Sequence, residues 1–289
     1  MKFISAIYGL VVAGLFTACT QTDYDTMTTD DDMVDLTITA RIPDQMTGAR
    51  SATVAQENAA IQRYVLETYE VSSGGNETLQ ATDTNLTGIF TYKLDRKKSY
   101  RFYCWADGGD ESAYDVDGGL KNVKIKSGSM PEIAHRGASD VIAGENPGDG
   151  ITIEMKHAVA KLVLMTTQPL KAGAVTAQTS TYMACNALTC AGLGDVVSIT
   201  SASGPDAMII DASPANPVEV LSMYIMAGAK EAFSVTLRNS TLQEASRTID
   251  NVPFAADCRT LLKGDVTSIN NYDVTLSATL DSNWNPAQP

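Results

Sequence analysis

The sequence of 289 residues is poor in the side chains that most enzymes use for catalysis. It holds only two histidines, and it contains no HExxH, GxSxG, CxxC or glycine-rich phosphate loop. Two histidines leave little for a Ser/His/Asp triad or a zinc site. Paired carboxylates can serve a glycosidase, but here the acidic residues lie mostly in turns and on the polar faces of strands. We therefore expect no enzyme activity, no cofactor and no metal site.

Basic residues are scarce as well. Lys and Arg total 21 against 34 Asp and Glu, which gives a formal net charge of −13. Because nucleic-acid binding depends on neutralising phosphates with Lys and Arg, we expect no nucleic-acid partner and no anionic membrane surface. The acidic residues between positions 107 and 117 can supply oxygen ligands to calcium. Their spacing matches no EF-hand, and ordinary turns explain them better.

Long apolar runs are absent too, since none reaches the roughly 20 residues that a membrane-spanning helix needs. A shorter run, residues 4–16, follows Lys2 and ends in Thr17-Ala18. A positive start, a short apolar stretch and small residues before the cut are typical of a secretory signal. The alternative is a buried helix or a membrane anchor. We predict a signal peptide at residues 1–18.

Cys19 stands where a bacterial lipobox has the cysteine that receives a diacylglycerol, with Phe16 in place of the usual Leu. We expect a palmitate-bearing lipoprotein, because several acyl chains that bury CH₂ groups at roughly 0.8 kcal/mol each hold a protein firmly. Residues 19–32 combine aspartates with threonines, so they predict a flexible acidic tether. This tether is either a plain spacer or, by resemblance to other surface lipoproteins, a signal for the outer face of the cell outer membrane.

Two segments show strict alternation of apolar and polar residues, which places one apolar face on an extended strand. Both are predicted strands, one at the start of the mature chain and one near its end. The apolar members of the first are Val34, Leu36, Ile38, Ala40 and Ile42. Those of the last are Tyr272, Val274, Leu276, Ala278 and Leu280.

Between them, many short strand-like runs are separated by glycine-rich turns, which indicates β-sandwiches or barrels. No segment has a long helical apolar stripe, although residues 257–263 can form a short helical turn. The strongest cluster of breaking residues spans positions 144–150. We predict an all-β chain of two tandem β-sandwich domains, an N-terminal one at residues 33–148 and a C-terminal one at residues 149–289.

Four cysteines remain once Cys19 is lipidated, and four cysteines allow three pairings. Cys185 and Cys190 can face each other across a tight turn. Cys104 lies in an apolar run that suits a buried free thiol. The sequence does not decide between disulfides and free thiols at these positions, or at Cys258.

The aromatic residues Tyr103, Trp105 and Tyr114 lie close together in the sequence. Alternating aromatic residues in a strand are more often part of the core than a platform for a sugar. The platform belongs to an alternative function, a monomeric outer-membrane surface lipoprotein that binds glycans or host ligands. That alternative predicts an exposed aromatic platform, for which Trp105 and Trp284 are candidates.

The layout of the chain resembles the fimbrillins, the pilin-like lipoproteins of type V pili in anaerobic gut and oral bacteria. The likeness covers the whole chain, and it depends on the order of motifs that are not specific one by one. After the lipoprotein signal and the first strand come Thr47-Gly48-Ala49-Arg50-Ser51, Tyr64-Val65-Leu66-Glu67-Thr68-Tyr69, residues 100–107, residues 157–162 and the last strand with Asp281 and Trp284.

The resemblance implies two transthyretin-like β-sandwich domains and assembly by strand exchange. In such pilins an arginine-specific protease cuts in the loop after the first strand, a place that Arg50 and Ser51 occupy here. Arg41 is a poorer candidate because it lies inside the strand. Cutting would remove residues 34–42 and leave an apolar groove that captures an extended segment, such as residues 272–280 of a neighbouring subunit.

The function implied is that of a fimbrillin-like structural or adhesive pilus subunit at the cell surface. Its partners would be other pilus subunits in a homo- or hetero-polymer, the protease, and ligands on host or bacterial surfaces. The alternative is that Arg50 is an ordinary loop residue and the chain stays uncut.

Overall fold

The computed structural model describes residues 32–42, 60–171, 175–203, 209–240, 245–269 and 276–282. These residues form β-strands and short 3₁₀ helices, with no α-helix among them, so the all-β prediction is confirmed. No helix within these ranges could cross a membrane. The signal peptide, Cys19, Arg50, Ser51, Tyr272, Val274 and Trp284 lie outside the described residues.

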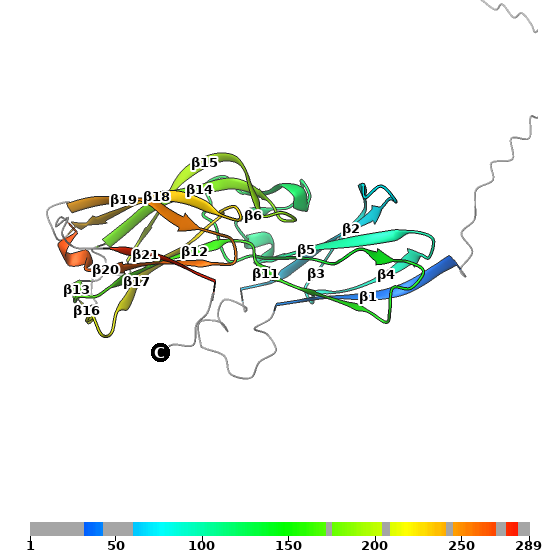
Figure 1. Cartoon of the computed structure of the whole chain (residues 1–289), viewed down its shortest axis with the longest axis horizontal. Coiled ribbons are helices and arrows are strands. Elements are labelled where there is room, and N and C mark those ends of the chain that lie inside the picture. Colours follow the sequence, from blue (N-terminus) through cyan, green and yellow to red (C-terminus); the bar gives the residue numbers. More distant parts are fainter. Residues whose placement is uncertain are drawn as a thin grey trace, which may run out of the picture.

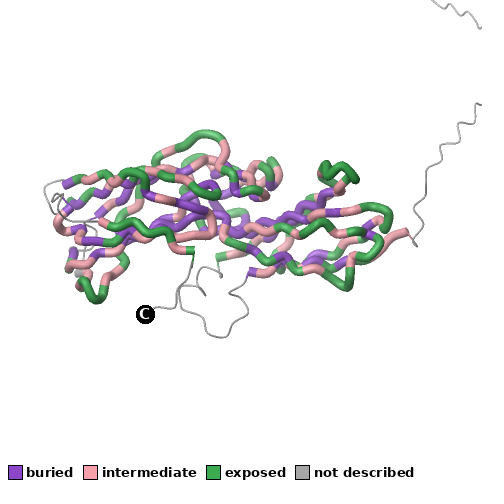
Figure 2. The backbone as a smooth tube through the Cα atoms, viewed as in Figure 1, coloured by how far each residue is buried: buried purple, intermediate pink, exposed green. Residues whose placement is uncertain are grey.

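The molecule is elongated and has two halves that follow each other along its long axis (Figure 1). The strands from β1 to β5 build one end, and those from β12 to β21 build the other. In both halves buried segments run along the inside, while the turns are exposed (Figure 2).

The first half packs a three-stranded sheet, ordered β10-β1-β4, against a second sheet ordered β11-β8-β5-β2-β3 with β9 beside β5. Apolar side chains of both sheets form one core that includes Leu36, Leu66, Phe90 and Phe102. The strands are β1 (Met33–Arg41), β2 (Arg63–Val71), β3 (Glu77–Asn85), β4 (Ile89–Asp95), β5 (Ser99–Asp107), β8 (His135–Ala138), β9 (Ile142–Ala143), β10 (Ile151–Glu154) and β11 (Lys156–His157).

The second half packs a sheet ordered β17-β12-β20-β21 against one ordered β19-β18-β14-β7-β6, with β15 on the other side of β14 and a small β13-β16 pair. Its core includes Leu162, Leu237 and Phe254. The strands are β6 (Tyr114–Asp115), β7 (Val123–Ile125), β12 (Ala160–Thr166), β13 (Leu170–Lys171), β14 (Val175–Asn186), β15 (Ala191–Ala202), β16 (Ile209–Ile210), β17 (Val218–Ile225), β18 (Glu231–Asn239), β19 (Ala245–Phe254), β20 (Arg259–Gly264) and β21 (Ser277–Asp281).

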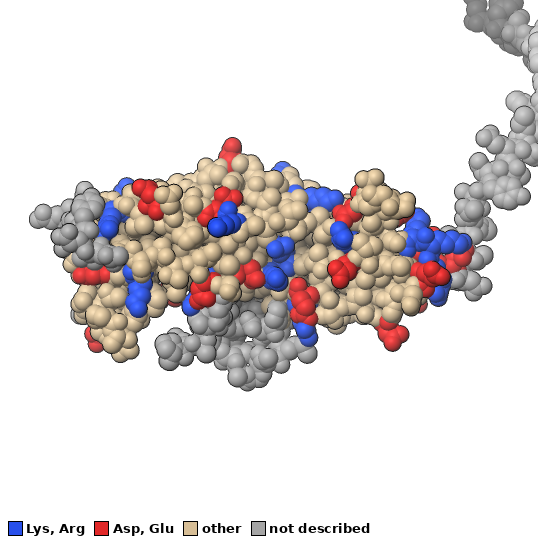
Figure 3. Space-filling model, in the orientation of Figure 1, with Lys and Arg blue, Asp and Glu red and all other residues tan. Residues whose placement is uncertain are grey.

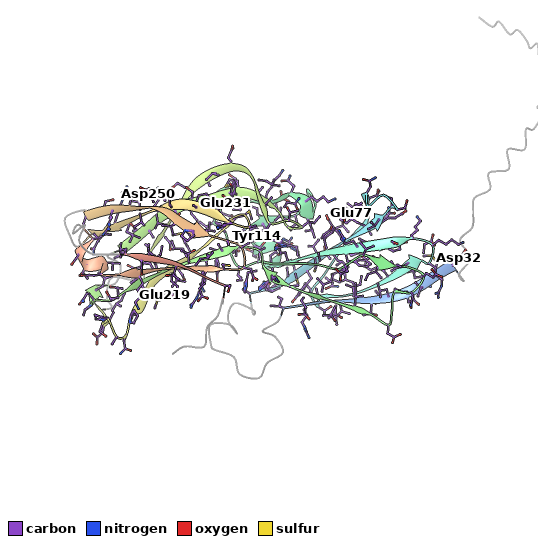
Figure 4. The ribbon with its side chains drawn as sticks, in the orientation of Figure 1. Asp32, Glu77, Tyr114, Glu219, Glu231 and Asp250 are labelled. Atoms are coloured by element: carbon purple, nitrogen blue, oxygen red, sulfur yellow. The ribbon has the colours of Figure 1, made fainter. Side chains whose placement is uncertain are left out.

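Around the middle of the chain, strands cross from one half into the sheets of the other half. β6 and β7 precede residue 148 but join the sheet of β14, whereas β10 and β11 follow it but join the sheets of the first half. A third apolar cluster, which includes Trp105, Tyr114 and Met226, fills the junction. Tyr114 accordingly lies near the centre of the molecule (Figure 4). The boundary between residues 148 and 149 stays a prediction.

Candidate functional site

The first strand, β1, is the candidate site that the sequence singles out. Its alternation gives the expected two faces, because Leu36, Ile38 and Ala40 are at most 5% exposed while Asp35 and Thr37 are exposed. Ile42, directly after the strand, is buried as well, and Val34 is half-buried. The predicted apolar face of this segment therefore contributes directly to the core.

β1 is the central strand of its sheet. It pairs antiparallel with β4 from Met33 to Thr39, and parallel with β10 from Ile38 to Arg41. Ile38 lies where the two ladders overlap, opposite Phe90 on one side and Ile151 on the other. A strand paired on both sides cannot leave without opening two rows of backbone hydrogen bonds.

Polar contacts hold the far end of β1. The Arg41 carbonyl accepts a hydrogen bond of 2.8 Å from the Met155 N–H, and the Ala40 N–H donates one of 2.8 Å to the Gly88 carbonyl. The Arg41 Nε donates to Glu154 across the parallel ladder at 3.0 Å. Both side chains of this ion pair are more than 40% exposed, so it adds little stability.

Removing β1 would leave an apolar groove between β4 and β10. Its walls would be side chains that now pack against β1 in the same core, among them Phe90, Leu94 and Ile153. Phe90 and Leu94 lie on β4 beside β1 and were not predicted as part of this site. The pairing of β1 with β10 was also missed, because a parallel contact between residues 113 positions apart leaves no local pattern.

The predicted donor strand lies in the other half, at the edge of the β17-β12-β20-β21 sheet. Residues 277–281 pair with β20 alone. Leu276 packs partly against the second core, but Ala278 and Leu280 are exposed. This segment is therefore held much less tightly than β1.

The aromatic residues do not form a surface platform. Trp105 and Tyr114 are 0% exposed and pack edge to face, with ring centroids 5.2 Å apart, and Tyr103 is 7% exposed. The expectation of a core role for Trp105 is correct. A glycan-binding function that depends on an exposed Trp105 is therefore excluded.

Asp107, one of the acidic residues considered for calcium, is engaged in protein contacts. Its carboxylate is fully buried and accepts hydrogen bonds from Arg63 at 2.7 and 2.9 Å, from the Trp105 indole at 2.9 Å and from the Gly109 N–H at 2.9 Å. Across the described ranges, no group of three or more His, Cys, Asp or Glu side chains is arranged to hold a metal ion.

A second buried carboxylate joins the two halves. Glu67 is 1% exposed, and it accepts hydrogen bonds from the Tyr69 hydroxyl at 2.8 Å and the Leu120 N–H at 2.9 Å. Leu120 belongs to the segment that leads into β7, so Glu67 of β2 fixes that segment in place. Burial, together with the hydrogen bond that the Tyr69 hydroxyl donates to Glu67, raises the pKa of Tyr69 above its ordinary value.

The two histidines, distant in sequence, meet at the junction of the halves. Their ring centroids are 4.5 Å apart, and His157 Nδ1 lies 3.1 Å from Asp257 Oδ1. His135 is 1% exposed, and neither ring nitrogen has a hydrogen-bond partner in the described part of the chain. Burial, with a contribution from His157, lowers the pKa of His135 well below 6.5.

This shift makes stability depend on pH. Below about pH 6.5 the unfolded chain takes up a proton at this histidine that the folded chain does not bind. The stability tied to neutral His135 is therefore present above pH 6.5 and is lost as the pH falls towards the lower folded-state pKa.

The four described cysteines carry free thiols, and three of them, Cys104, Cys185 and Cys190, are buried. Burial, with a smaller effect of Cys190, raises the pKa of Cys185 to about 12. Cys258 is half-buried, and burial raises the pKa of its thiol too.

A cavity of about 600 Å³ opens between the halves, lined by Glu132 and Ser112 on one side and Lys161, Glu219 and Tyr224 on the other. Tyr224 is the one aromatic side chain among its described lining residues. On the face shown in Figure 3, basic and acidic side chains alternate and do not gather into a single basic patch.

Solved structures share this architecture. A candidate polysaccharide-binding protein (DUF1812) from Bacteroides thetaiotaomicron is 12% identical with a TM-score of 0.53, and the match covers 86% of this chain and 96% of that one. A candidate adhesin from the same species is 11% identical with a TM-score of 0.51, covering 86% and 95%. The fimbrial anchor protein Mfa2 from Porphyromonas gingivalis is 10% identical with a TM-score of 0.48, covering 86% and 97%.

At these identities the likeness concerns the fold. The chain shares its two-sandwich, all-β architecture with that candidate adhesin, so the expected likeness is confirmed at the level of the fold. By sequence, the chain belongs to a family of unknown function, DUF6562, whose profile matches residues 28–288. No curated protein matches it.

Proposed function

We propose that this protein is a non-catalytic, surface-anchored subunit of an adhesive fibre and that it assembles by exchange of β1. The main support is the position of β1, which is central in its sheet, buried on its apolar face, and followed within a few residues by the segment that contains Arg50. A cut after Arg50 would separate this strand covalently from the sandwich that it completes.

The size of the vacated site explains why it would be refilled. Burial of Leu36, Ile38 and Ile42 contributes about 1.5–3 kcal/mol each, so the gross loss is on the order of 5–9 kcal/mol. This is comparable to the stability of a whole domain. The exposed backbone groups of β4 and β10 add to the loss, because buried N–H and C=O groups need partners. An extended segment with the same alternation would recover most of it.

Residues 272–280 of a neighbouring subunit fit that requirement. Leu276, Ala278 and Leu280 repeat the spacing of Leu36, Ile38 and Ala40. Their strand has a single ladder partner, β20, so leaving its own subunit breaks one row of hydrogen bonds. Inserting between β4 and β10 would form two.

Anchoring follows from the N-terminal segment. A lipid on Cys19 and the acidic tether at residues 19–32 would hold the uncut chain at the cell outer membrane, with the sandwiches exposed. Cleavage would release the sandwiches for incorporation into a fimbrium, while an uncut chain would remain as an anchored or terminal subunit. Adhesion to host or bacterial surfaces would then be a property of the assembled fibre.

The test is cleavage of the full-length chain by an arginine-specific protease, with Arg50→Ala as the matched control. We expect a new N-terminus at Ser51 and oligomers that appear only in the cleaved parent chain. A Leu276→Asp, Leu280→Asp chain should be cut normally but should fail to grow, because charged side chains cannot enter the groove. A chain that is cut at Ser51 and stays monomeric would contradict the proposal.

A further inference from the structure

β15 leaves one long edge of the second half open. Among the described strands it pairs with β14 only. A register shift between Tyr182 and Ala184 interrupts the ladder, and beyond it residues 196–202 run in unbroken register with residues 176–182. The strand arches along the outside of the molecule, and much of it is exposed (Figures 1 and 2).

The regular part of this edge lacks the charged residues, prolines and bulges that normally prevent edge-to-edge pairing. The regular part, residues 196–202, reads Val-Val-Ser-Ile-Thr-Ser-Ala. The outer strands of the other sheets carry charged residues, among them Glu77 in β3, Lys93 in β4, Glu154 in β10, Glu219 in β17, Arg247 in β19 and Asp281 in β21. β15 is therefore an unusual edge within this molecule.

The hydrogen bonds of β14 show which backbone groups of β15 face outward. The Ser203 N–H donates to the Val175 carbonyl at 2.8 Å, so this is a hydrogen-bonded pair. The Tyr182 N–H points away from β15, because it donates to the Met226 carbonyl at 3.0 Å. Bonded and non-bonded pairs alternate along an antiparallel ladder. The N–H and C=O groups that face the open edge are those of Val196, Ser198, Thr200 and Ala202.

We propose that two copies of this protein join through antiparallel β15–β15 pairing about a two-fold axis at Ile199. In this register Val196 of one copy lies opposite Ala202 of the other, and Ser198 lies opposite Thr200. Every outward N–H group then meets an outward C=O group. A shift by two residues leaves an end of the ladder unpaired, so the axis at Ile199 is favoured.

The side chains suit the same pairing. The residues whose backbone groups face the open edge are Val196, Ser198, Thr200 and Ala202, and Val196 is 48% exposed. They are small and uncharged, so the register opposes no like charges. Asp195, the charged residue of β15, falls opposite Ser203 of the second copy. The partner that this edge fits is therefore a second copy of the chain, in a symmetric interface.

The β15 pairing is independent of strand exchange, because β1 and β15 lie in different halves. It requires no cleavage at Arg50, so it would operate on the uncut, anchored chain. Failure of one proposal leaves the other unaffected.

The first test is sedimentation equilibrium of the full-length, uncut chain in detergent. Thr200→Pro removes an outward N–H that β14 does not use, and Thr200→Ala keeps it. We expect a dimer for the parent and for Thr200→Ala, and a dissociation constant at least tenfold higher for Thr200→Pro. A parent chain that is monomeric at every concentration, or a Thr200→Pro chain that dimerises as the parent does, would overturn the proposal.

A second experiment covers the case in which the proline variant folds poorly. Chains with Ser198→Cys and with Thr200→Cys are mixed in equal amounts under oxidised glutathione, since opposed strand positions lie within disulfide reach. We expect a linked heterodimer from the mixture and only the background of the parent from either variant alone. Equal cross-linking in all samples would argue that the copies meet elsewhere.

Discussion

Replacement of Ile38 by alanine tests whether β1 is an integral part of the first sandwich. Ile38 is 0% exposed and faces neighbours on both flanking strands, Phe90 and Ile151. Such a substitution costs about 2–5 kcal/mol, and the cost is higher where the surroundings cannot collapse into the cavity. Because strands on both sides hold this position rigidly, we expect about 3–4 kcal/mol.

The measurement is thermal unfolding of the uncut full-length chain by calorimetry, supported by urea titration. In a chain of this size each kcal/mol lowers the midpoint by roughly 2–4 °C, so Ile38→Ala should lower it by roughly 6–16 °C. The matched control is Thr37→Ala on the same strand. Its side chain is exposed, so the expected loss is under about 1 kcal/mol.

Equal effects of the two substitutions would refute this reasoning. So would an Ile38→Ala chain that unfolds within about 0.5 kcal/mol of the parent, the range typical of surface changes. Either result would mean that the sandwich does not depend on β1, and the strand could then not act as its removable part.

Three further outcomes follow from the buried polar groups. Glu67→Gln should lower the free energy of unfolding, measured in urea, by about 1–3 kcal/mol, because the new amide NH₂ would face either the Tyr69 hydroxyl or the Leu120 N–H, both of which are donors. The control Glu70→Gln weakens a surface ion pair with Lys98 and should cost under about 1 kcal/mol. The free energy of unfolding should decrease as the pH is lowered from 7.5 to 5, and His135→Phe should make this decrease smaller. An unchanged pH dependence in His135→Phe would show that the histidine does not titrate as described. In native protein iodoacetamide should label Cys258 before Cys185, because Cys185 is buried and its burial raises the pKa of its thiol to about 12. Mass spectrometry that finds Cys185 labelled first would contradict this order.

Strict alternation identified the first strand, whereas at the last strand Ala278 and Leu280 of the predicted apolar face are exposed. Residues 34–42 were predicted as a strand with one buried face, and β1 (Met33–Arg41) has that face in the core. The strand β3 had no such signal, because its Thr-, Asp- and Asn-rich sequence lies at an edge with most side chains in water. β14 was missed for another reason: many of its inward positions hold Ala or Thr, which have weak apolar contrast.

Local pattern also failed where tertiary pairing decides the structure. Residues 257–263 were expected to allow a helical turn, which is wrong, because Arg259–Gly264 forms β20 between β12 and β21. Lysines flank Val123 and Ile125 in the sequence, yet β7 lies between β14 and β6 with both apolar side chains buried. Contacts such as Glu67 with the Leu120 N–H depend on a fold that brings distant segments together.

The parallel pairing of β1 with β10 has a consequence for the order of folding. Arg41 and Glu154 are 113 positions apart, so the parallel contact of β1 closes a longer loop, at a higher entropy cost, than its antiparallel contact with β4. Non-local pairings of this kind are slow to form. We therefore expect the β1–β4 ladder to form first and the β1–β10 ladder to complete the first sandwich late in folding.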